Sequence, residues 1–461
     1  MKKFDTIVKG GTVVTASDTF KADLGIKEGK ILEIGLDLGE EAEKVVDATN
    51  KYVFPGGIDP HTHMDMPFGG TFSSDDFETG TKAAACGGTT TIVDFSIQTK
   101  GGSLREATKT WREKADGKAV IDYGIHIALT DMTEEVMNEI PEIIADGYQS
   151  FKLFMTYDGL RVDDGTLLRT LMKVNENGGL SSVHAENYYV IDYMTKKLLS
   201  EGKIEPIYHA LSRPDLAEGE AAGRAIKLAK IANAPLFIVH NSCEASISEI
   251  ERARKEGYPI MGETCPQYLL LSEDNYREPG FNGAKYVMSP PLRDKKNWPH
   301  IWKALKDNSL QVVATDHCPF FMKQKELGKE SFAKIPNGAP GVEARMALMY
   351  TYGVVEGKFD LNRFVQVTST NAAKVYGMYP QKGTIAVGSD ADLVVFDPNI
   401  ETTLTKSMLH ENVDYTPFEG FKLKGYPVAT LSRGEVIAEN GKYVGKEGRG
   451  QFIKRTAPQV V

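Results

Sequence analysis

The chain has 461 residues, of which 41% are hydrophobic and 25% charged, a composition typical of a folded globular protein rather than a disordered one. This length is sufficient for one large domain and a smaller second one. The formal net charge of -9 argues against a nucleic-acid partner and against an anionic membrane surface, because both favour basic proteins.

The start of the chain, MKKFDTIVKGGTVV, passes directly into alternating strand-like residues and lacks the apolar core of a signal peptide. No run of about 18 apolar residues follows, so no membrane span is expected. The cysteines are scattered without CxxC spacing; they are Cys86, Cys243, Cys265 and Cys318. We therefore expect a cytoplasmic protein whose cysteines are reduced and buried.

The two ends of the chain have the same sequence pattern, which is typical of short strands and turns. Residues 1–54 and 381–461 consist of short β-branched runs separated by Gly, Asp and Asn, such as ADLGIKEGKILEIG and GYPVATLSRGEVIAENG. Each end alone provides too few strands for a stable sheet face. We therefore predict that they pair into one small β-sandwich domain that is discontinuous in sequence.

The middle of the chain, residues 55–380, alternates short apolar strands with amphipathic stretches such as residues 133–144 and 244–257. We count eight candidate strands, in the segments FPGGIDPHTH, GGTTTIVDFS, DYGIHIALT, SFKLFMT, GLSSVHAEN, APLFIVHNS, YPIMGETCP and LQVVATDHCP. Eight such units predict an α/β fold, a (β/α)₈ TIM-like barrel, with insertions after the fifth, seventh and eighth strands.

Polar side chains gather where these strands end, which is where barrels of this kind place their chemistry. They are His61 and His63 after the first strand, Lys152 in the fourth, His184 after the fifth, His240 after the sixth and Asp316 after the eighth. Singly, each has a structural explanation as a core histidine, a turn aspartate or a surface lysine. Their shared position at equivalent strand ends favours a functional site.

Four neutral imidazoles and a carboxylate are ligands for zinc or a similar divalent metal, including manganese or cobalt. Five side chains exceed the three that a single catalytic zinc usually takes, which favours two metals. Lys152 lies in the apolar run SFKLFMT, where an ammonium needs a partner or must lose its charge. A carbamate formed from its neutral amine and carbon dioxide would be long enough to bridge two cations.

Six motifs together resemble the cyclic amidohydrolases, and most closely the dihydropyrimidinases and bacterial D-hydantoinases. They are GGIDPHTHMDMPFGG, SFKLFMTYDG, VHAEN, VHNS, SPPLR and ATDHCPF, and the likeness extends over essentially the whole chain. The resemblance implies hydrolysis of the cyclic amide bond of 5-substituted hydantoins and dihydropyrimidines to N-carbamoyl amino acids. It also implies a homotetramer with two Zn²⁺ ions in each subunit.

The resemblance assigns roles to individual residues. It implies that His61, His63 and Asp316 hold one zinc, that His184 and His240 hold the other, and that N6-carboxylated Lys152 bridges them. Asp316 would accept the proton of the attacking water and pass it to the leaving ring nitrogen. Tyr157 would donate a hydrogen bond to the developing oxyanion. Backbone groups beside Ser289 and Asn337 would bind the cyclic ureide.

One position separates this chain from two related groups, in one of which, the dihydroorotases, an arginine meets the substrate carboxylate. Related dihydroorotases and allantoinases usually carry an arginine two residues after the second histidine, where this chain has Asp65. An acid there disfavours an anionic substrate. Phe68, Phe72, Phe77 and Phe154 are candidates for an apolar substituent pocket, or alternatively for core and rim packing.

Three alternatives stay open at this point. The first is an allantoinase-like cyclic amidohydrolase. The second is a non-catalytic dihydropyrimidinase-related interaction protein, which metal content would test. The third is a single-metal deaminase of the wider amidohydrolase group, which would not need Lys152.

Overall fold

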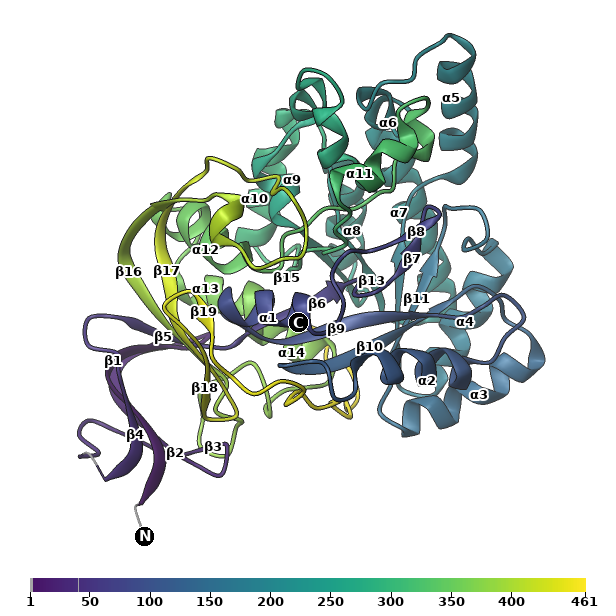
Figure 1. Cartoon of the computed structure of the whole chain (residues 1–461). Helices are drawn as coiled ribbons and strands as arrows, with labels where there is room; N and C mark the ends of the chain where they lie inside the picture. The colour runs from purple at the N-terminus through teal and green to yellow at the C-terminus, as the bar shows by residue number, and fades with distance from the viewer. Residues whose placement is uncertain (1–2, 40) are drawn as a thin grey trace.

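Eight parallel strands form a barrel beside a second, larger sheet in the computed structural model, which describes residues 3–39 and 41–461 (Figure 1). The barrel strands are β6 (Gly57–Thr62), β9 (Thr89–Ile97), β10 (Asp122–Leu129), β11 (Ser150–Phe154), β12 (Leu180–His184), β13 (Leu236–Ile238), β14 (Ile260–Thr264) and β15 (Val312–Val313). A parallel bridge between Thr62 and His317 joins β6 to the segment after β15 and closes the barrel. The predicted (β/α)₈ barrel is therefore confirmed, with one strand in each predicted segment.

Helices follow the strands. They are α1 (Thr79–Cys86), α2 (Leu104–Ala115), α3 (Glu134–Ala145), α4 (Asp164–Glu176), α5 (Tyr188–Ser200), α6 (Ile207–Leu211), α7 (Asp215–Ala232), α8 (Glu244–Lys255), α9 (Pro266–Leu270), α10 (Trp298–Lys306), α11 (Met322–Lys325), α12 (Arg345–Met349), α13 (Leu361–Val365) and α14 (Asn371–Val375). The two predicted amphipathic stretches correspond to α3 and α8. In α8 the buried residues Ile247, Ile250 and Ala253 recur at helical spacing, which places one face on the barrel.

The insertions also occur where they were predicted. Helices α5 and α6 follow β12, α9 and several short turns follow β14, and a long connection containing α11 follows β15. Figure 1 shows α5, α6, α11 and the small hairpin of β7 (Pro67–Phe68) and β8 (Thr71–Phe72) on one side of the barrel. These segments cover the ends of the strands that carry the polar residues. In the described part of the chain, no helix is long and apolar enough to cross a membrane.

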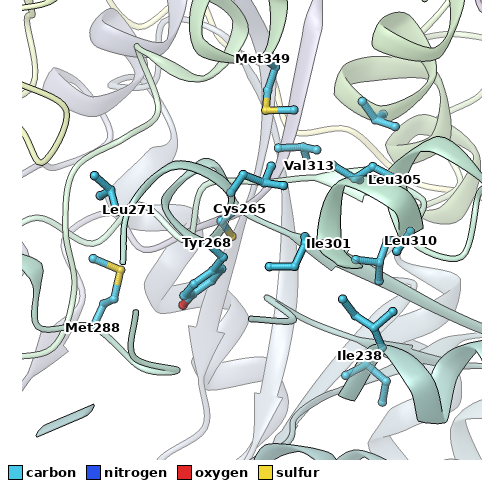
Figure 2. Close-up of a cluster of buried hydrophobic side chains, with 14 of the residues drawn as sticks. Ile238, Cys265, Tyr268, Leu271, Met288, Ile301, Leu305, Leu310, Val313 and Met349 are labelled. Atoms are coloured by element: carbon cyan, nitrogen blue, oxygen red, sulfur yellow. The ribbon is translucent and has the colours of Figure 1, made fainter. Parts of the chain in front are cut away.

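An apolar core holds the outer helices on the last barrel strands. Figure 2 shows part of it, with side chains from β13, β15, α9, α10 and α12: Ile238, Cys265, Tyr268, Leu271, Met288, Ile301, Leu305, Leu310, Val313 and Met349. Fully burying one such aliphatic side chain stabilises the fold by about 1.5–3 kcal/mol. All four cysteines are free and buried, as expected.

The two ends of the chain share one nine-stranded, mostly antiparallel sheet. Its strands are β1 (Phe4–Val14), β2 (Thr19–Lys27), β3 (Lys30–Gly35), β4 (Ala42–Asp47), β5 (Tyr52–Pro55), β16 (Leu393–Thr403), β17 (Lys422–Ser432), β18 (Glu435–Glu439) and β19 (Lys442–Tyr443). Strand β5 pairs antiparallel with β16 and so joins the two ends, with Val53 opposite Val395. The predicted pairing of the ends is confirmed, while the domain boundaries at residues 54/55 and 380/381 stay predictions.

The last residues leave this sheet and lie against the barrel. The backbone N–H of Tyr123 in β10 donates to the carbonyl of Gln451 at 2.9 Å, and Ile453 donates back to Tyr123 at 2.8 Å. The guanidinium of Arg455, which is 3% exposed, donates to Ser150 Oγ at the start of β11 at 2.7 Å. The tail therefore supports the amino-terminal ends of the strands, opposite the polar residues.

Candidate metal centre and active site

All residues predicted for the site line one cavity of about 50 Å³ at the carboxyl ends of the barrel strands. They are His61, His63, Lys152, Tyr157, His184, His240, Ser289, Asp316 and Asn337. Parallel strands end at the same rim of a barrel, so side chains separated by more than 250 residues in sequence meet there. The residues that the sequence predicted to meet at the strand ends therefore do lie together in one cavity.

Three of these residues have strained backbones. Tyr157, His240 and Asp316 have φ values of +75°, +37° and +54°, in the left-handed region that side chains other than glycine rarely adopt. Such conformations cost about 1–3 kcal/mol each and persist only where surrounding structure enforces them. All three lie two or three residues beyond the end of a barrel strand, where this turn directs the side chains into the cavity.

Asp316 lies between the first two histidines. Its Oδ1 is 3.2 Å from His61 Nε2 and 3.0 Å from His63 Nε2. Ligand atoms about 2.0 Å from a tetrahedral zinc are about 3.3 Å apart, so these separations fit a shared cation. Ligand atoms of His61, His240 and Asp316 also lie within 4.8 Å of one another.

The second pair of histidines adjoins the first. The rings of His184 and His240 have centroids 4.4 Å apart, and the His61 and His240 centroids are 5.3 Å apart. Burial holds the pKa of His61 and His240 well below the ordinary value and lowers that of His184, which keeps the imidazoles neutral, the form that binds metal. In the described residues, His63 Nδ1 and His240 Nδ1 are buried without a hydrogen-bond partner.

Lys152 is 1% exposed in β11, within the same cavity. Its Nζ lies 5.1 Å from the ring centroid of Phe95 and 5.4 Å from that of Phe154, and no carboxylate of the described residues is within ion-pair distance. Burial lowers the pKa of Lys152 to about 7 against the opposing effect of Glu263 and Asp316. A substantial share of this amine is therefore neutral near physiological pH.

Two carboxylates that our sequence analysis missed support the histidines. Glu263 in β14 hydrogen-bonds His61 Nδ1, and Glu186 Oε2 is 2.7 Å from His184 Nε2. Arg213 donates to the same Glu186 oxygen at 2.8 Å. Burial raises the pKa of Glu186, but Arg213 and His184 lower it further, so the net result is below the ordinary value. Carboxylates in such positions orient metal-binding imidazoles.

A signal for both carboxylates was present in the sequence. Glu263 is a lone charge in the apolar strand segment YPIMGETCP, the same anomaly that singled out Lys152. Glu186 follows His184 by two residues in VHAEN, the spacing that His61 and His63 share. Arg213, which comes from the insertion between α6 and α7, had no such local signal.

Tyr157 lies over the histidine cluster. Its ring centroid is 5.3 Å from that of His184 and 5.4 Å from that of Phe68, and the Arg213 guanidinium is 5.8 Å from the ring. Burial raises the pKa of Tyr157 to about 12, so its hydroxyl keeps its proton and can donate a hydrogen bond. Ser289 and Asn337 oppose this rise through hydrogen bonding.

The loops that carry Ser289 and Asn337 are joined to each other. Asn337 Nδ2 donates to Ser289 Oγ at 3.1 Å. Beneath them, the fully buried Lys325 in α11 donates to the carbonyls of Val287 at 2.9 Å and Pro336 at 2.7 Å. Lys325 has no signal in the sequence, because a lysine in a short polar helix has no distinguishing pattern. The result is a fixed wall of backbone groups opposite the histidines.

The remaining lining is apolar and consists of Met66, Phe68, Ile97, Phe154 and Leu160, with Cys318 and Gly338 at its edge. Of the four aromatic candidates, Phe68 and Phe154 line the cavity. Phe77 is fully buried in the core, and Phe72 is 57% exposed.

Asp65 does not act as we inferred from the sequence. It lies outside the cavity lining, where its Oδ2 is 3.4 Å from Lys114 Nζ. A positive φ of +49° turns Asp65 away from the strand end, which a residue count could not reveal. Asp65 therefore offers no charge to the cavity. Lys152 is the one cation among the described residues that line the cavity, and its charge is weakened by burial.

Comparison with known proteins agrees with this geometry. Residues 52–437 match the amidohydrolase family. A D-hydantoinase from Geobacillus stearothermophilus is 53% identical over 452 residues, which cover 97% of this chain and 96% of that protein. The crystal structure of a dihydropyrimidinase from Brevibacillus agri NCHU1002 superposes with a TM-score of 0.97 at 52% identity, over 98% of this chain and 99% of the other. The chain therefore belongs to the amidohydrolase family and, as its motifs predict, to the cyclic amidohydrolases that include the D-hydantoinases.

Proposed function

We propose that this protein hydrolyses the cyclic amide bond of 5-substituted hydantoins and dihydropyrimidines and releases N-carbamoyl amino acids. The observation that carries the proposal is the meeting of four imidazoles, one carboxylate and a buried lysine in one cavity with an apolar wall. D-Hydantoinases and a dihydropyrimidinase at about half identity over nearly the whole chain support the same reaction.

His61, His63 and Asp316 would hold one divalent ion, and His184 and His240 a second, with Zn²⁺ expected and Mn²⁺ or Co²⁺ suited to the same ligands. The separations of about 3 Å between Asp316 and the first two histidines support this assignment. When bound, such ions lower the pKa of a water molecule from about 15.7 to about 7 and polarise the substrate carbonyl.

Lys152 would join the two ions as an N6-carboxylysine. The neutral amine attacks carbon dioxide, a C–N bond forms, and one proton leaves, which yields a carbamate that carries a negative charge. The burial of Lys152 and the lack of a nearby carboxylate favour the neutral amine that this step needs. The reaction also removes the cost of burying an unpaired ammonium.

The chain's own side chains would then move the protons and hold the substrate. Asp316, within 3.2 Å of both first histidines, accepts the proton of the attacking water and delivers it to the leaving ring nitrogen. Tyr157 donates its hydroxyl proton in a hydrogen bond to the oxyanion that forms at the carbonyl. Backbone groups beside Ser289 and Asn337 pair with the N–H and C=O edges of the ring.

The cavity favours neutral rings, because Lys152, whose charge is weakened by burial, is the one lysine or arginine among the described residues that line it. The direct test is steady-state hydrolysis of dihydrouracil, hydantoin, racemic 5-phenylhydantoin, allantoin and dihydroorotate by enzyme loaded with zinc. We expect the first three to be opened and dihydroorotate to be left intact. Faster turnover of dihydroorotate than of hydantoin would contradict the proposal.

The non-catalytic alternative makes a different prediction for metal content. An interaction protein that has lost the reaction would hold no metal above trace at the histidine cluster after growth with zinc, whereas we expect at least two ions per chain. We also propose a homotetramer in the cytoplasm. Light scattering of the purified protein, which should give four times the chain mass, tests the oligomeric state.

A further inference from the structure

A second cluster of metal-binding side chains lies outside the active-site cavity. Cys86 ends α1, Glu343 precedes α12, and His410 lies in the connection of residues 404–421 between β16 and β17. One ligand atom from each of the three lies within 4.8 Å of the other two. Cys86 and Glu343 are 3% and 1% exposed, whereas the His410 side chain is 36% exposed, so the cluster is buried but reaches solvent on one side.

Hydrogen bonds already hold these groups together. His410 Nδ1 is 2.7 Å from Glu343 Oε1, and the His410 backbone N–H donates to Glu343 Oε2 at 2.6 Å. Cys86 Sγ completes the group, within 4.8 Å of the ligand atoms of Glu343 and His410. Next to them, Glu411 is 2% exposed, and its Oε2 has no hydrogen-bond partner in the part of the chain that the structure describes. An unpaired buried carboxylate oxygen is costly unless a cation offsets it.

We propose that Cys86, Glu343 and His410 form a binding site for one divalent cation of the zinc class, separate from the catalytic pair. A thiolate, an imidazole and a carboxylate are the three ligand types that zinc takes in proteins, and a thiolate disfavours magnesium and calcium. The exposed edge at His410 leaves the fourth position to water.

Charge balance supports the proposal. With the cysteine as thiolate, the histidine neutral and Glu343 ionised, the three ligands carry two negative charges and match a divalent cation. The three ligands can therefore take the ion without a net charge on the ligand set itself. With a monovalent cation, the same three ligands would keep a net negative charge.

The ion would cross-link three segments that are distant in sequence. The segment that carries His410 also contacts the barrel through the Asn412 backbone N–H, which donates to Asp75 Oδ1 at 2.9 Å. Asp75 Oδ2 in turn is 3.0 Å from Nε2 of His317, the neighbour of Asp316. The site would therefore hold this connection against the barrel and take no direct part in ring opening.

Cobalt provides the test, because a cobalt–thiolate bond adds a charge-transfer band in the near ultraviolet. The enzyme is stripped with a chelator, reloaded with Co²⁺, desalted and assayed for cobalt per chain, absorbance and hydantoin hydrolysis. The variants are Cys86→Ser and His410→Gln, the second at a half-exposed position that limits folding damage. Cys243→Ser, a buried cysteine at the start of α8, is the matched control.

We expect both cluster variants to hold one cobalt fewer per chain than wild type, to lose the thiolate band and to keep hydrolysis within about twofold, because the cluster lies outside the cavity. The control should keep the metal and the band. Equal cobalt content in all four proteins, or a band unaffected by Cys86→Ser and His410→Gln, would overturn the proposal. Neither result depends on ring opening, so the proposed activity is tested separately.

Discussion

Two lysines, each 1% exposed, lie in two different regions of this molecule and have opposite surroundings. Lys382, where the barrel meets the terminal sheet, has its Nζ 2.6 Å from Asp122, 2.6 Å from Asp392 and 3.0 Å from Asp390. Lys152, at the rim of the barrel, lies between aromatic rings and has no carboxylate of the described residues within ion-pair distance. The pKa of Lys382 is raised by its three partners despite burial, and that of Lys152 is lowered to about 7 by burial.

The difference shows that burial alone does not identify a functional lysine. A buried ammonium with a complete set of partners holds structure together, and here Lys382 connects the start of β10 to the segment before β16. A buried amine without a partner is costly as a cation and is available for chemistry as a base or nucleophile. The surroundings of each lysine therefore predict opposite consequences when it is replaced.

Replacement of Lys152 should have the largest effect. We expect Lys152→Ala to lose metal and to lower kcat/KM by about 10³-fold or more, because hydroxide is scarce near neutral pH without the metals. Metal analysis and steady-state hydrolysis of hydantoin measure both. If a carbamate bridges the ions, a small carboxylate such as propionate should restore part of the activity to this variant. Full metal content and full activity in Lys152→Ala would instead favour the single-metal alternative.

Replacement of Lys382 should affect stability and leave the chemistry intact. Lys382→Met leaves the buried Asp392 without a cation within ion-pair distance in the described residues, whereas Asp390 keeps Lys30 and Asp122 keeps Arg433. Removal of one partner from a buried ion pair typically costs about 3–5 kcal/mol. Denaturant unfolding should show a lower midpoint, while kcat/KM of the folded enzyme stays near wild type. A large loss of kcat/KM with an unchanged unfolding midpoint would show that Lys382 serves activity rather than stability, and the proposed difference between the two lysines would then be wrong.

The pH dependence gives a second measure of the same cluster. Lys382 opposes the effect of burial and holds the pKa of Asp390 below its ordinary value. A depressed carboxyl pKa stabilises the fold above the unfolded-state value of about 3.9 and loses this contribution as the pH falls through the folded-state pKa. The difference in the free energy of unfolding between wild type and Lys382→Met should therefore become smaller below about pH 4.

Replacement of Tyr157 tests whether a residue that is not a proposed metal ligand contributes to catalysis. Tyr157→Phe keeps the ring contacts with Phe68 and His184 and removes only the hydroxyl. Loss of one oxyanion donor typically lowers kcat by about 10²–10³-fold. We expect kcat to fall with KM and metal content little changed, measured at saturating hydantoin. A rise in KM alone would show that the hydroxyl binds substrate without stabilising the transition state.

The strand ends of the site were predictable, and the contacts between insertions were not. Lys152 stood out as a charge within an apolar strand, and His61 and His240 stood out because they follow strands, and barrel closure then forces them together. Arg213 comes from an insertion whose path no local pattern encodes, and Lys325 acts through backbone carbonyls. Asp65 was predicted to act on the substrate and does not line the cavity. One left-handed turn places it beside Lys114 instead.

Replacement of Glu186 should have the smallest effect on activity, because Glu186 contacts the proposed metal ligand His184 and not the substrate. Its carboxylate links His184 to Arg213, at 2.7 and 2.8 Å. Changes at residues that orient metal-binding histidines typically weaken metal affinity by about 10–100-fold. Glu186→Gln should therefore need more zinc for half-maximal activity yet approach wild-type kcat when zinc is saturating, which Lys152→Ala should not.

The matched control for this last variant is Glu218→Gln. Glu218 is also buried and paired with an arginine, Arg293, at 2.7 Å, but it contacts Ser242 and Ser246 rather than a histidine of the cavity. If Glu186 acts by orienting His184, only Glu186→Gln shifts the zinc dependence, measured by competition with a chelator. Equal shifts in both variants would mean that loss of any buried ion pair loosens the rim, and the orienting role of Glu186 would then fail.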